Sequence, residues 1–372
     1  MDMRILLETM VAQRASDLFI TVGLPPSLKV DGRIDPLAYP PLTPEQADGL
    51  VASVMSEAQR AEFAQEHECN FAISDPAHGR FRVSAFRQRG DAGMVLRRIE
   101  GEIPTLESLH LPPVIASLAM AKRGLVIFVG GTGSGKSTSL AAMIGHRNRH
   151  GSGHIVTLED PIEFVHTHAG CIITQREVGL DTASYAVGLK NTLRQAPDVI
   201  LIGEIRTREA MDHAIAFAET GHLCLSTLHA NNANQALDRI INFFPEDRRN
   251  QLLMDLAFNL KAVVAQQLIP SASGGRRRAA VEVLLNTPLA AEQIRLGEIH
   301  KLKELMSRST QQGMSTFDRS LFELHKEGAI SYDEAIRHAD STNEVRLMIK
   351  LDEEDPAKLA DALAGVSLQD LR

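Results

Sequence analysis

Short apolar runs alternate with longer helical patterns from residue 125 onward. Four runs have the composition of buried strands: Leu125 to Val129, His154 to Leu158, Val199 to Ile202 and Leu223 to Ser226. Each run is too short to form a helix of its own, and long segments with helical patterns separate the runs. The alternation predicts an α/β fold in which helices cover a parallel sheet.

The segment that follows, Glu246 to Leu268, is predicted to form one long helix that lays an apolar stripe against the core. The residues of this stripe are Leu253, Leu256, Leu260, Val263, Val264 and Leu268. Ser271 to Arg278 is then interpreted as a loop and Ala279 to Leu285 as a further strand, and several short helices follow.

The first hundred residues have a different pattern, which is typical of a small mixed α/β domain. Asp17 to Val22 and Ser27 to Val30 are predicted strands, and Thr43 to Phe63 is a predicted helical stretch. Arg80 to Arg87 alternates between apolar and polar positions and is followed by a glycine-rich turn and the strand Met94 to Ile99. These two strands predict a hairpin.

Domain boundaries are suggested by composition. Gly101 to Pro113 contains three prolines and reads as a linker. The expected division is an N-terminal domain over residues 1–100, a second domain over residues 101–345 and a C-terminal extension over residues 346–372. In the extension an acidic cluster precedes a short amphipathic helical pattern, which indicates either a partner-binding segment or a frayed, solvated end. That pattern consists of Leu359, Leu363, Val366 and Leu371.

Bulk properties narrow the class of protein. The chain has 372 residues, of which 44% are hydrophobic and 23% are charged, as is usual for a soluble globular protein. No stretch approaches the roughly 18 apolar residues of a membrane span, and the N-terminus lacks a signal pattern, so a cytoplasmic protein is expected. A net charge of -8 argues against nucleic acid as a partner.

The cysteines are few and scattered. Cys69, Cys171 and Cys224 have no C-x-x-C spacing. Neither a disulfide framework nor a zinc site is therefore indicated, and three reduced, buried side chains are expected.

A phosphate-binding loop is the strongest chemical signal. A G-x-x-x-x-G-K-S pattern lies between the apolar run that ends at Val129 and a helical segment. Glycines allow the backbone to wrap around an oligophosphate, Lys136 reaches the β- and γ-phosphates, and the Ser137 hydroxyl can ligate Mg²⁺. The candidate nucleotide-binding residues are Gly130, Gly131, Thr132, Gly133, Ser134, Gly135, Lys136, Ser137 and Thr138.

A carboxylate follows another predicted strand. Val199 to Ile202 continues into Gly203 and Glu204, a layout that brings an acid to the water shell of Mg²⁺ beside a phosphate loop. Gly203 occupies a position where many such enzymes have Asp. The alternative is a buried strand with a chance terminal Glu.

A second acidic cluster runs from Glu159 to Glu163, after the predicted strand His154 to Leu158. In a parallel sheet this cluster emerges at the same edge as Glu204 and the phosphate loop. Hydrolysis of a γ-phosphate requires a residue that orients or deprotonates water; Glu163 is the preferred candidate and Glu159 the alternative. An exposed, solvated turn would give the same pattern.

Two histidines flank the predicted strand Leu223 to Leu228. The spacing of His222 and His229 fits no usual zinc pattern, so metal ligation is rejected. His229 ends the strand beside Ala230 and Asn231 and is a candidate sensor of the γ-phosphate. A histidine bonded to a backbone carbonyl is the alternative for both.

With these motifs in order, the chain resembles the secretion-type ATPases of type IV pilus and type II secretion systems. The resemblance covers roughly residues 1–345 and is closest to the PilT/PilU family of pilus retraction ATPases. Gly130 to Ser137 matches the family's Walker A motif, Glu159 to Glu163 its Asp box, Ile200 to Glu204 its Walker B strand and Gly221 to His229 its His box.

The resemblance implies a PAS-like N-terminal domain, a RecA-like P-loop ATPase domain with C-terminal helices, and assembly into a hexameric ring. It also implies ATP and Mg²⁺ as cofactors and a place at the cytoplasmic face of the inner membrane. The expected partners are an inner-membrane pilus platform protein and a partner retraction ATPase.

Two departures favour the accessory branch of this family. Ile205-Arg206-Thr207 stands where the principal retraction motor has Met-Arg-Asp, and Thr287 to Glu298 lacks its Ala-Ile-Arg-Asn-Leu-Ile-Arg run. The chain also continues beyond the usual end of that motor. An accessory retraction motor is thus expected; an assembly or secretion motor, or a nucleotide-binding regulator with little turnover, is the alternative.

Arginines of the N-terminal domain complete the candidate site. Arg82 and Arg97 lie on the paired predicted strands and match family positions that point to the adjacent subunit's phosphates. There a guanidinium would offset charge that develops on the γ-phosphoryl group. Solvated residues on an exposed strand face are the alternative.

Overall fold

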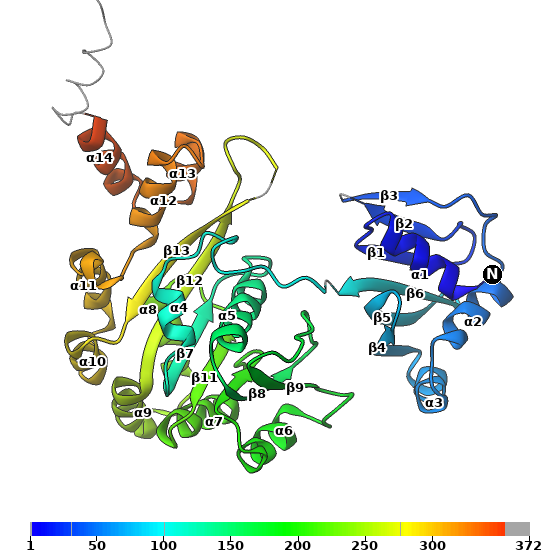
Figure 1. Ribbon diagram of the computed structural model, residues 1–372, viewed down its shortest axis with the longest axis horizontal. Helices are drawn as coiled ribbons and strands as arrows, with labels where there is room; N and C mark the ends of the chain where they lie inside the picture. The colour runs from blue at the N-terminus through cyan, green and yellow to red at the C-terminus, as the bar shows by residue number, and fades with distance from the viewer. Residues whose placement is uncertain (1, 31, 100, 276, 354–372) are drawn as a thin grey trace, which may run out of the picture. The chain divides into compact units, whose positions relative to one another are not determined.

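The computed structural model describes residues 2–30, 32–99, 101–275 and 277–353. The chain divides into two compact units, and Figure 1 shows both. The first contains residues 1–103 together with 163–166, and the second contains residues 104–162 and those from 167 onward. The division into residues 1–100, 101–345 and 346–372 stays a prediction.

The first unit is built on an antiparallel sheet with the strand order β3-β2-β1-β6-β5-β4. Its strands are β1 Asp17–Ile20, β2 Ser27–Val30, β3 Arg33–Pro36, β4 Glu68–Asp75, β5 Gly79–Gln88 and β6 Asp91–Ile99. The predicted hairpin is the pair β5 and β6, in which Phe81, Val83 and Ala85 are buried, as the alternation indicates.

Three helices accompany this sheet: α1 Met3–Ala12, α2 Pro44–Ser53 and α3 Glu57–Glu66. The prediction of one helical stretch from Thr43 to Phe63 is wrong in detail, because two helices form there. Thr43 and Ser56 each begin a capping box, with Gln46 and Gln59 as the reciprocal partners. A second capping box starts a new helix, so the chain turns between α2 and α3.

The second unit contains a seven-stranded sheet with the order β13-β12-β7-β11-β10-β8-β9. Its strands are β7 Gly124–Val129, β8 Gly153–Glu159, β9 Cys171–Glu177, β10 Val199–Ile202, β11 Leu223–Leu228, β12 Leu260–Ile269 and β13 Arg278–Leu285. The strands from β12 to β9 pair in parallel, whereas β13 is antiparallel to its neighbour β12. The parallel sheet predicted from the apolar runs is confirmed.

The prediction of one helix from Glu246 to Leu268 is wrong. The helix α9 spans Glu246–Asn259, and the side chain of Asn286 donates hydrogen bonds to the carbonyls of Ala257 and Leu260 at its end. The next ten residues form β12, which lies between β7 and β13 and is buried on both faces. A strand buried on both faces shows no alternation, and its apolar residues then match helical spacing by chance.

Helices cover both faces of this sheet (Figure 1). One face packs on α4 Val114–Ala119 and α5 Lys136–His150. The other packs on α6 Tyr185–Thr192, α7 Arg208–Glu219, α8 Ala233–Asn242 and α9. The α-helices that follow β13 in the described part of the chain are α10 Pro288–Arg295, α11 Leu302–Arg308, α12 Phe317–Lys326, α13 Tyr332–His338 and α14 Thr342–Glu353. The expected α/β class is confirmed, as are the expected helices after the last strand.

Other expectations concern the cysteines, the end of the chain and the membrane. Cys69, Cys171 and Cys224 are buried and free, as expected. The amphipathic pattern from Leu359 to Leu371 lies outside the described residues. Of the helices in the described ranges, none combines the length and the hydrophobicity that crossing a bilayer requires.

Candidate nucleotide site

The carboxyl ends of four parallel strands form one edge of the second unit's sheet. The strands β7, β11, β10 and β8 lie in this order, and Val129 pairs with Leu228 while Leu158 pairs with Ile202. The phosphate loop follows β7, His229 follows β11, Glu204 follows β10 and Glu159 ends β8. The fold therefore places these candidate residues at the same edge.

The phosphate loop is tightly wound where the chain passes from β7 to α5. Lys136 is the first residue of α5, and its Nζ atom donates hydrogen bonds of 2.8 Å to the carbonyls of Gly130 and Gly131. A Cβ atom on Gly130 would lie 2.4 Å from Ser134 Oγ, and Gly135 has a φ of 87°. Both positions therefore require glycine.

A glutamine of β12 braces this loop from the sheet. The side chain of Gln266 is buried; its Nε2 atom donates a 2.8 Å hydrogen bond to the carbonyl of Ser134, and its Oε1 atom accepts a 2.7 Å bond from Ser139 Oγ. One amide thus joins the loop to the first turns of α5. The sequence reasoning missed this residue, because it lies more than a hundred positions from both partners and in a strand that was predicted as helix.

The unpaired groups of the loop fit an oligophosphate. Among the described residues Ser134 Oγ, which is buried, has no hydrogen-bond partner, and Gly135, the N-cap of α5, provides no side-chain cap. Backbone N–H groups at such a helix start bind anions, and the nearby ammonium of Lys136 adds a positive charge. Ser137 and Thr138 lie on the same first turn, half-buried. The residues present therefore suit a nucleotide's phosphates.

Glu204 lies beside a histidine and an arginine. Its carboxylate is 2.7 Å from the guanidinium of Arg206 and 3.4 Å from His229 Nε2, and its side chain is 17% exposed. The hydrogen bond and charge of Glu204 raise the pKa of Arg206 above its ordinary value. The structure thus brings together Glu204 and His229, which the sequence singled out, and adds Arg206.

Position 203, where many related enzymes have Asp, has little room for a side chain. A Cβ atom there would lie 2.9 Å from the hydroxyl of Tyr185 and 3.2 Å from the backbone of Glu159. Burial, and then the charges of Asp160 and Glu159, raise the pKa of the Tyr185 phenol, so this group stays neutral. Because a side chain does not fit at position 203, Glu204 is the first residue after β10 that can provide a carboxylate.

The Glu159 carboxylate is engaged with its own sheet. Its Oε1 atom accepts hydrogen bonds from Thr157 Oγ1 at 2.6 Å and from Gln175 Nε2 at 3.2 Å. Glu159 also ends β8, which is separated from the phosphate-loop strand β7 by β11 and β10. These contacts hold the carboxylate toward β9.

Three further candidates lie in the first unit. Glu163 is exposed, and residues 163–166 group with that unit. Arg82 and Arg97 are directly opposite each other on β5 and β6, and both are exposed. The Nε atom of Arg97 is 2.7 Å from the buried carboxylate of Asp17. Because these residues and the phosphate loop belong to different units, their roles in the site stay predictions.

His222 has backbone partners at the end of α7. Its Nδ1 atom lies 3.2 Å from the carbonyl of Phe217 and 3.1 Å from Thr220 Oγ1. These contacts favour the structural interpretation of this histidine.

An open cleft of about 820 Å³ adjoins the phosphate loop. It is bounded on one side by the loop and on the other by the chain from His229 into α8. Its lining residues are Gly130, Gly131, Thr132, His229, Ala230, Asn231, Gln235, Asp238, Arg239, Asn242 and Phe243. The cleft therefore joins the candidate phosphate site to the candidate γ-phosphate sensor.

Within the described residues, no group of three or more His, Cys, Asp and Glu side chains is arranged to hold a metal ion. Mg²⁺ in nucleotide sites is held mainly by phosphates and water, with one or two protein ligands. The Ser137 hydroxyl and the Glu204 carboxylate are chemically suited to these positions.

Comparison with known proteins gives a consistent result. The family described as Type II/IV secretion system protein matches residues 3–337. The type IV pilus ATPase PilU of Pseudomonas aeruginosa is 64% identical over 370 residues, which are 99% of this chain and 97% of that protein. The type IV pilus retraction ATPase PilT of the same organism is 39% identical over 335 residues, or 90% and 97% of the two chains.

A solved structure agrees with these sequence matches. The crystal structure of the pilus retraction motor PilT with bound ADP has a TM-score of 0.87 and 37% sequence identity, and the match covers 92% of this chain and 98% of that one. The expected resemblance to retraction ATPases, the expected fold and the expected ATPase class are confirmed.

Proposed function

We propose that this chain, which belongs to the Type II/IV secretion system protein family, is the ATPase of a pilus retraction machine, acting as its accessory motor. It hydrolyses ATP to ADP and phosphate and converts this reaction into motion between its domains. The 64% identity to PilU over nearly the whole chain supports the accessory role.

One observation carries the ATPase proposal. The phosphate loop, His229 and Glu204 occur at the same edge of one sheet, and the first two line a single cleft. His229 follows β11, the strand between those that lead to the loop and to Glu204, and its Nε2 atom is 3.4 Å from the Glu204 carboxylate. Residues that bind phosphates and residues that respond to the γ-phosphate are thus adjacent, as phosphoryl transfer requires.

Each candidate residue has a role in this proposal. Lys136 leaves its two carbonyl partners and neutralises the β- and γ-phosphates when ATP binds. Ser137 and Glu204 are the residues that would hold Mg²⁺, which would offset negative charge on the phosphates. His229 contacts the γ-phosphate. Glu163 orients the attacking water, and it is preferred to Glu159 because the latter's carboxylate accepts bonds from Thr157 and Gln175.

A ring of six subunits would supply Arg82 and Arg97 from a neighbour. The bond from Arg97 Nε to Asp17 leaves its terminal nitrogens available for a phosphate while it fixes the direction of the side chain. An Arg97→Ala ring and a Lys136→Ala ring should each be inactive. Mixed rings contain interfaces in which both residues are intact, so mixing the two variants should restore part of the turnover. Co-assembled mixtures that stay inactive would contradict sharing between subunits.

The proposed place of action is the cytoplasmic face of the inner membrane, on the pilus platform protein and beside a partner retraction ATPase. Deletion of the gene should leave excess surface pili, and the wild-type chain but not Lys136→Ala should reverse this. Loss of pili on deletion would indicate an assembly or secretion motor. Full complementation by Lys136→Ala would indicate a regulator that needs no turnover.

A further inference from the structure

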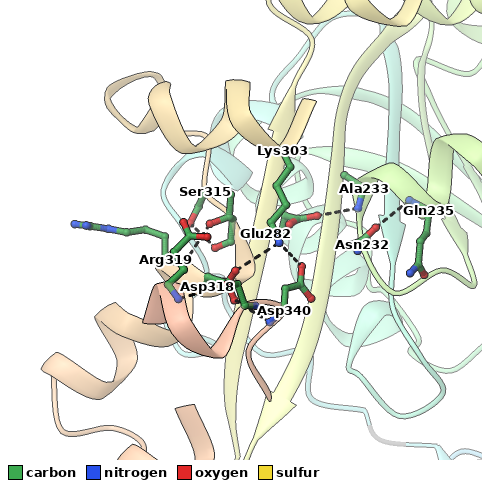
Figure 2. A network of polar contacts seen from close by, with 12 residues as sticks. Asn232, Ala233, Gln235, Glu282, Lys303, Ser315, Asp318, Arg319 and Asp340 are labelled. Carbon is green, nitrogen blue, oxygen red and sulfur yellow. Dashed lines mark hydrogen bonds and ion pairs between the residues drawn. The ribbon is translucent and has the colours of Figure 1, made fainter. Parts of the chain in front are cut away.

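A buried carboxylate outside the phosphate loop contacts the other wall of the cleft. Glu282 lies on β13 and is 1% exposed. Its Oε1 atom accepts a 2.8 Å hydrogen bond from the backbone N–H of Ala233, the first residue of α8 (Figure 2). A helix start leaves such N–H groups without intrahelical partners, so this bond fixes where α8 begins.

The start of α8 is ordered by its own side chains as well. Asn232 caps the helix through a 2.9 Å bond from Gln235 N–H, and Gln235 Oε1 accepts a 3.2 Å bond from the N–H of Asn231. Asn231 and Gln235 line the cleft. The residues that face the nucleotide cleft and the N–H that Glu282 holds therefore belong to one short, hydrogen-bonded turn.

The same carboxylate lies where the C-terminal helices meet the sheet. Lys303 of α11 is 2.9 Å from Asp340 and 3.5 Å from the fully buried Asp318 of α12 (Figure 2). Asp318 also accepts hydrogen bonds from the N–H groups of Asp340 and Ser341, just before α14. These contacts join α11, α12 and the start of α14.

Backbone pairing connects this cluster to β13. The N–H of Val283 donates to the carbonyl of Ser315 at 2.8 Å, and the N–H of Ser315 donates back at 3.1 Å. Ser315 lies two residues before the start of α12, and Val283 follows Glu282. A displacement of the C-terminal helices would therefore move the segment of β13 that holds α8.

We propose that Glu282 is a positioning residue for the ATP site: it holds the first turn of α8, and through it the His229 to Asn231 wall, in register with the C-terminal helices. The inference rests on the proposed function, because it assigns that wall to recognition of the γ-phosphate. It predicts that Glu282 matters for ATP and little for ADP, whose phosphates are bound by the loop.

Charge supports a role beyond packing. Burial raises the pKa of Glu282 to about 7, and the hydrogen bond from the N–H of Ala233 is the largest effect that opposes this shift; the charge of Asp340 adds to the shift and that of Lys303 opposes it. A carboxylate accepts a stronger hydrogen bond from an N–H than a neutral group does. An apolar residue of similar size would fill this position without the cost of burying a charge. Packing alone therefore does not explain a carboxylate here, whereas the hydrogen bond that it accepts from the start of α8 does.

The test is equilibrium binding of ADP and of a non-hydrolysable ATP analogue to the full chain with Mg²⁺. The measurement is made at pH 8, above the pKa of about 7 of the Glu282 carboxyl, where Glu282→Gln keeps the shape of the side chain and removes its charge. Its affinity for the analogue should fall about five- to tenfold, the loss expected for one weakened charge-assisted bond, while ADP affinity stays within about twofold. Glu292→Gln, the same change at an exposed pair with Arg295 on α10, should alter neither affinity.

Equal losses for both nucleotides, or no loss for either, would overturn the proposal. If Glu282→Gln does not fold, Glu282→Met offers an apolar side chain of similar length, and the same ratio of affinities is measured. A wild-type chain that binds neither nucleotide would instead refute the proposed function.

Hydrogen exchange tests the connection to the C-terminal helices. In the wild type, the analogue should change exchange in a peptide that includes Asp340 and Ser341, whose N–H groups are bonded to Asp318. In Glu282→Gln this change should be lost or clearly smaller. An identical change in both proteins would show that Glu282 does not transmit the response.

Discussion

The phosphate loop and the first turn of α8 face the same cleft but are held in different ways. The loop is fixed by neutral groups: backbone carbonyls that bind Lys136 and the amide of Gln266. The first turn of α8 is fixed by the buried, ionisable Glu282, close to a charged cluster of C-terminal helices. The difference suggests a division of labour, in which the loop supplies affinity and the α8 wall responds to the γ-phosphate and to the rest of the protein.

The largest effect is expected when the positively charged side chain of the phosphate loop is removed. Lys136→Ala should lower ATP affinity by roughly a thousandfold, about 4 kcal/mol, because two or more charge-assisted bonds to phosphate are lost. Fluorescent-nucleotide titration measures the change, with Lys190→Ala, a cation at the end of α6, as the control. Unchanged affinity would show that the loop does not bind the phosphates.

A carboxylate outside both regions separates binding from turnover. Glu163→Gln should keep ATP affinity and lower the rate of hydrolysis by on the order of a hundredfold to a thousandfold, because an amide cannot accept the proton of the attacking water. Glu159→Gln is the matched variant and should have a smaller effect. If Glu159→Gln is the slower enzyme, the assignment within this cluster must be reversed.

Glu282, which holds the start of α8, is ionisable, so the free energy of unfolding is predicted to depend on pH. Glu282 has a folded pKa of about 7 against an ordinary value of 4.5, so the folded state keeps a proton that the unfolded state loses in this window. The favourable contribution of Glu282 to the free energy of unfolding is thus complete below pH 4.5 and is lost as the pH rises through 7. Between pH 5 and 8 the wild type should lose about 2 to 3 kcal/mol relative to Glu282→Gln. Denaturant midpoints of unfolding that change with pH by the same amount in the two proteins would contradict this.

Removing Gln266, the neutral side chain that braces the loop, should have a smaller effect on affinity than removing Lys136. Gln266→Ala leaves the Ser134 carbonyl and the Ser139 hydroxyl without their partner, and about tenfold weaker binding of both ADP and ATP is expected. An equal loss for the two nucleotides distinguishes this variant from Glu282→Gln. Gln251→Ala, which removes an exposed amide on α9 that donates to Asp255, serves as the control, and a loss for ATP alone would contradict the assignment.

The two regions also differ in how far the sequence predicts them. The phosphate loop is a contiguous motif whose chemistry depends on local backbone geometry, so its residues and the strand before it could be identified directly. Gln266 and Glu282 could not, because their partners lie far away in sequence. For Gln266 there is a second reason, since β12, which carries it, was predicted as part of a helix. The helical spacing of Leu260, Val263 and Val264 is misleading in a strand that is buried on both faces.

At the acidic edge the sequence predicted which residues gather but not their partners. Glu159, Glu204 and His229 follow neighbouring strands, so parallel topology was sufficient to place them together. The contact of Glu204 with Arg206 and that of Glu159 with Gln175 depend on side-chain directions that no spacing encodes.

The most direct test of the account is phosphate release from Mg-ATP by the purified full chain, alone and with a partner retraction motor. The account predicts steady release by the wild type that follows saturation with ATP and is absent in Lys136→Ala. Tight, Lys136-dependent binding of ATP without phosphate release in either condition would contradict it, because the chain would then bind nucleotide without acting as a motor.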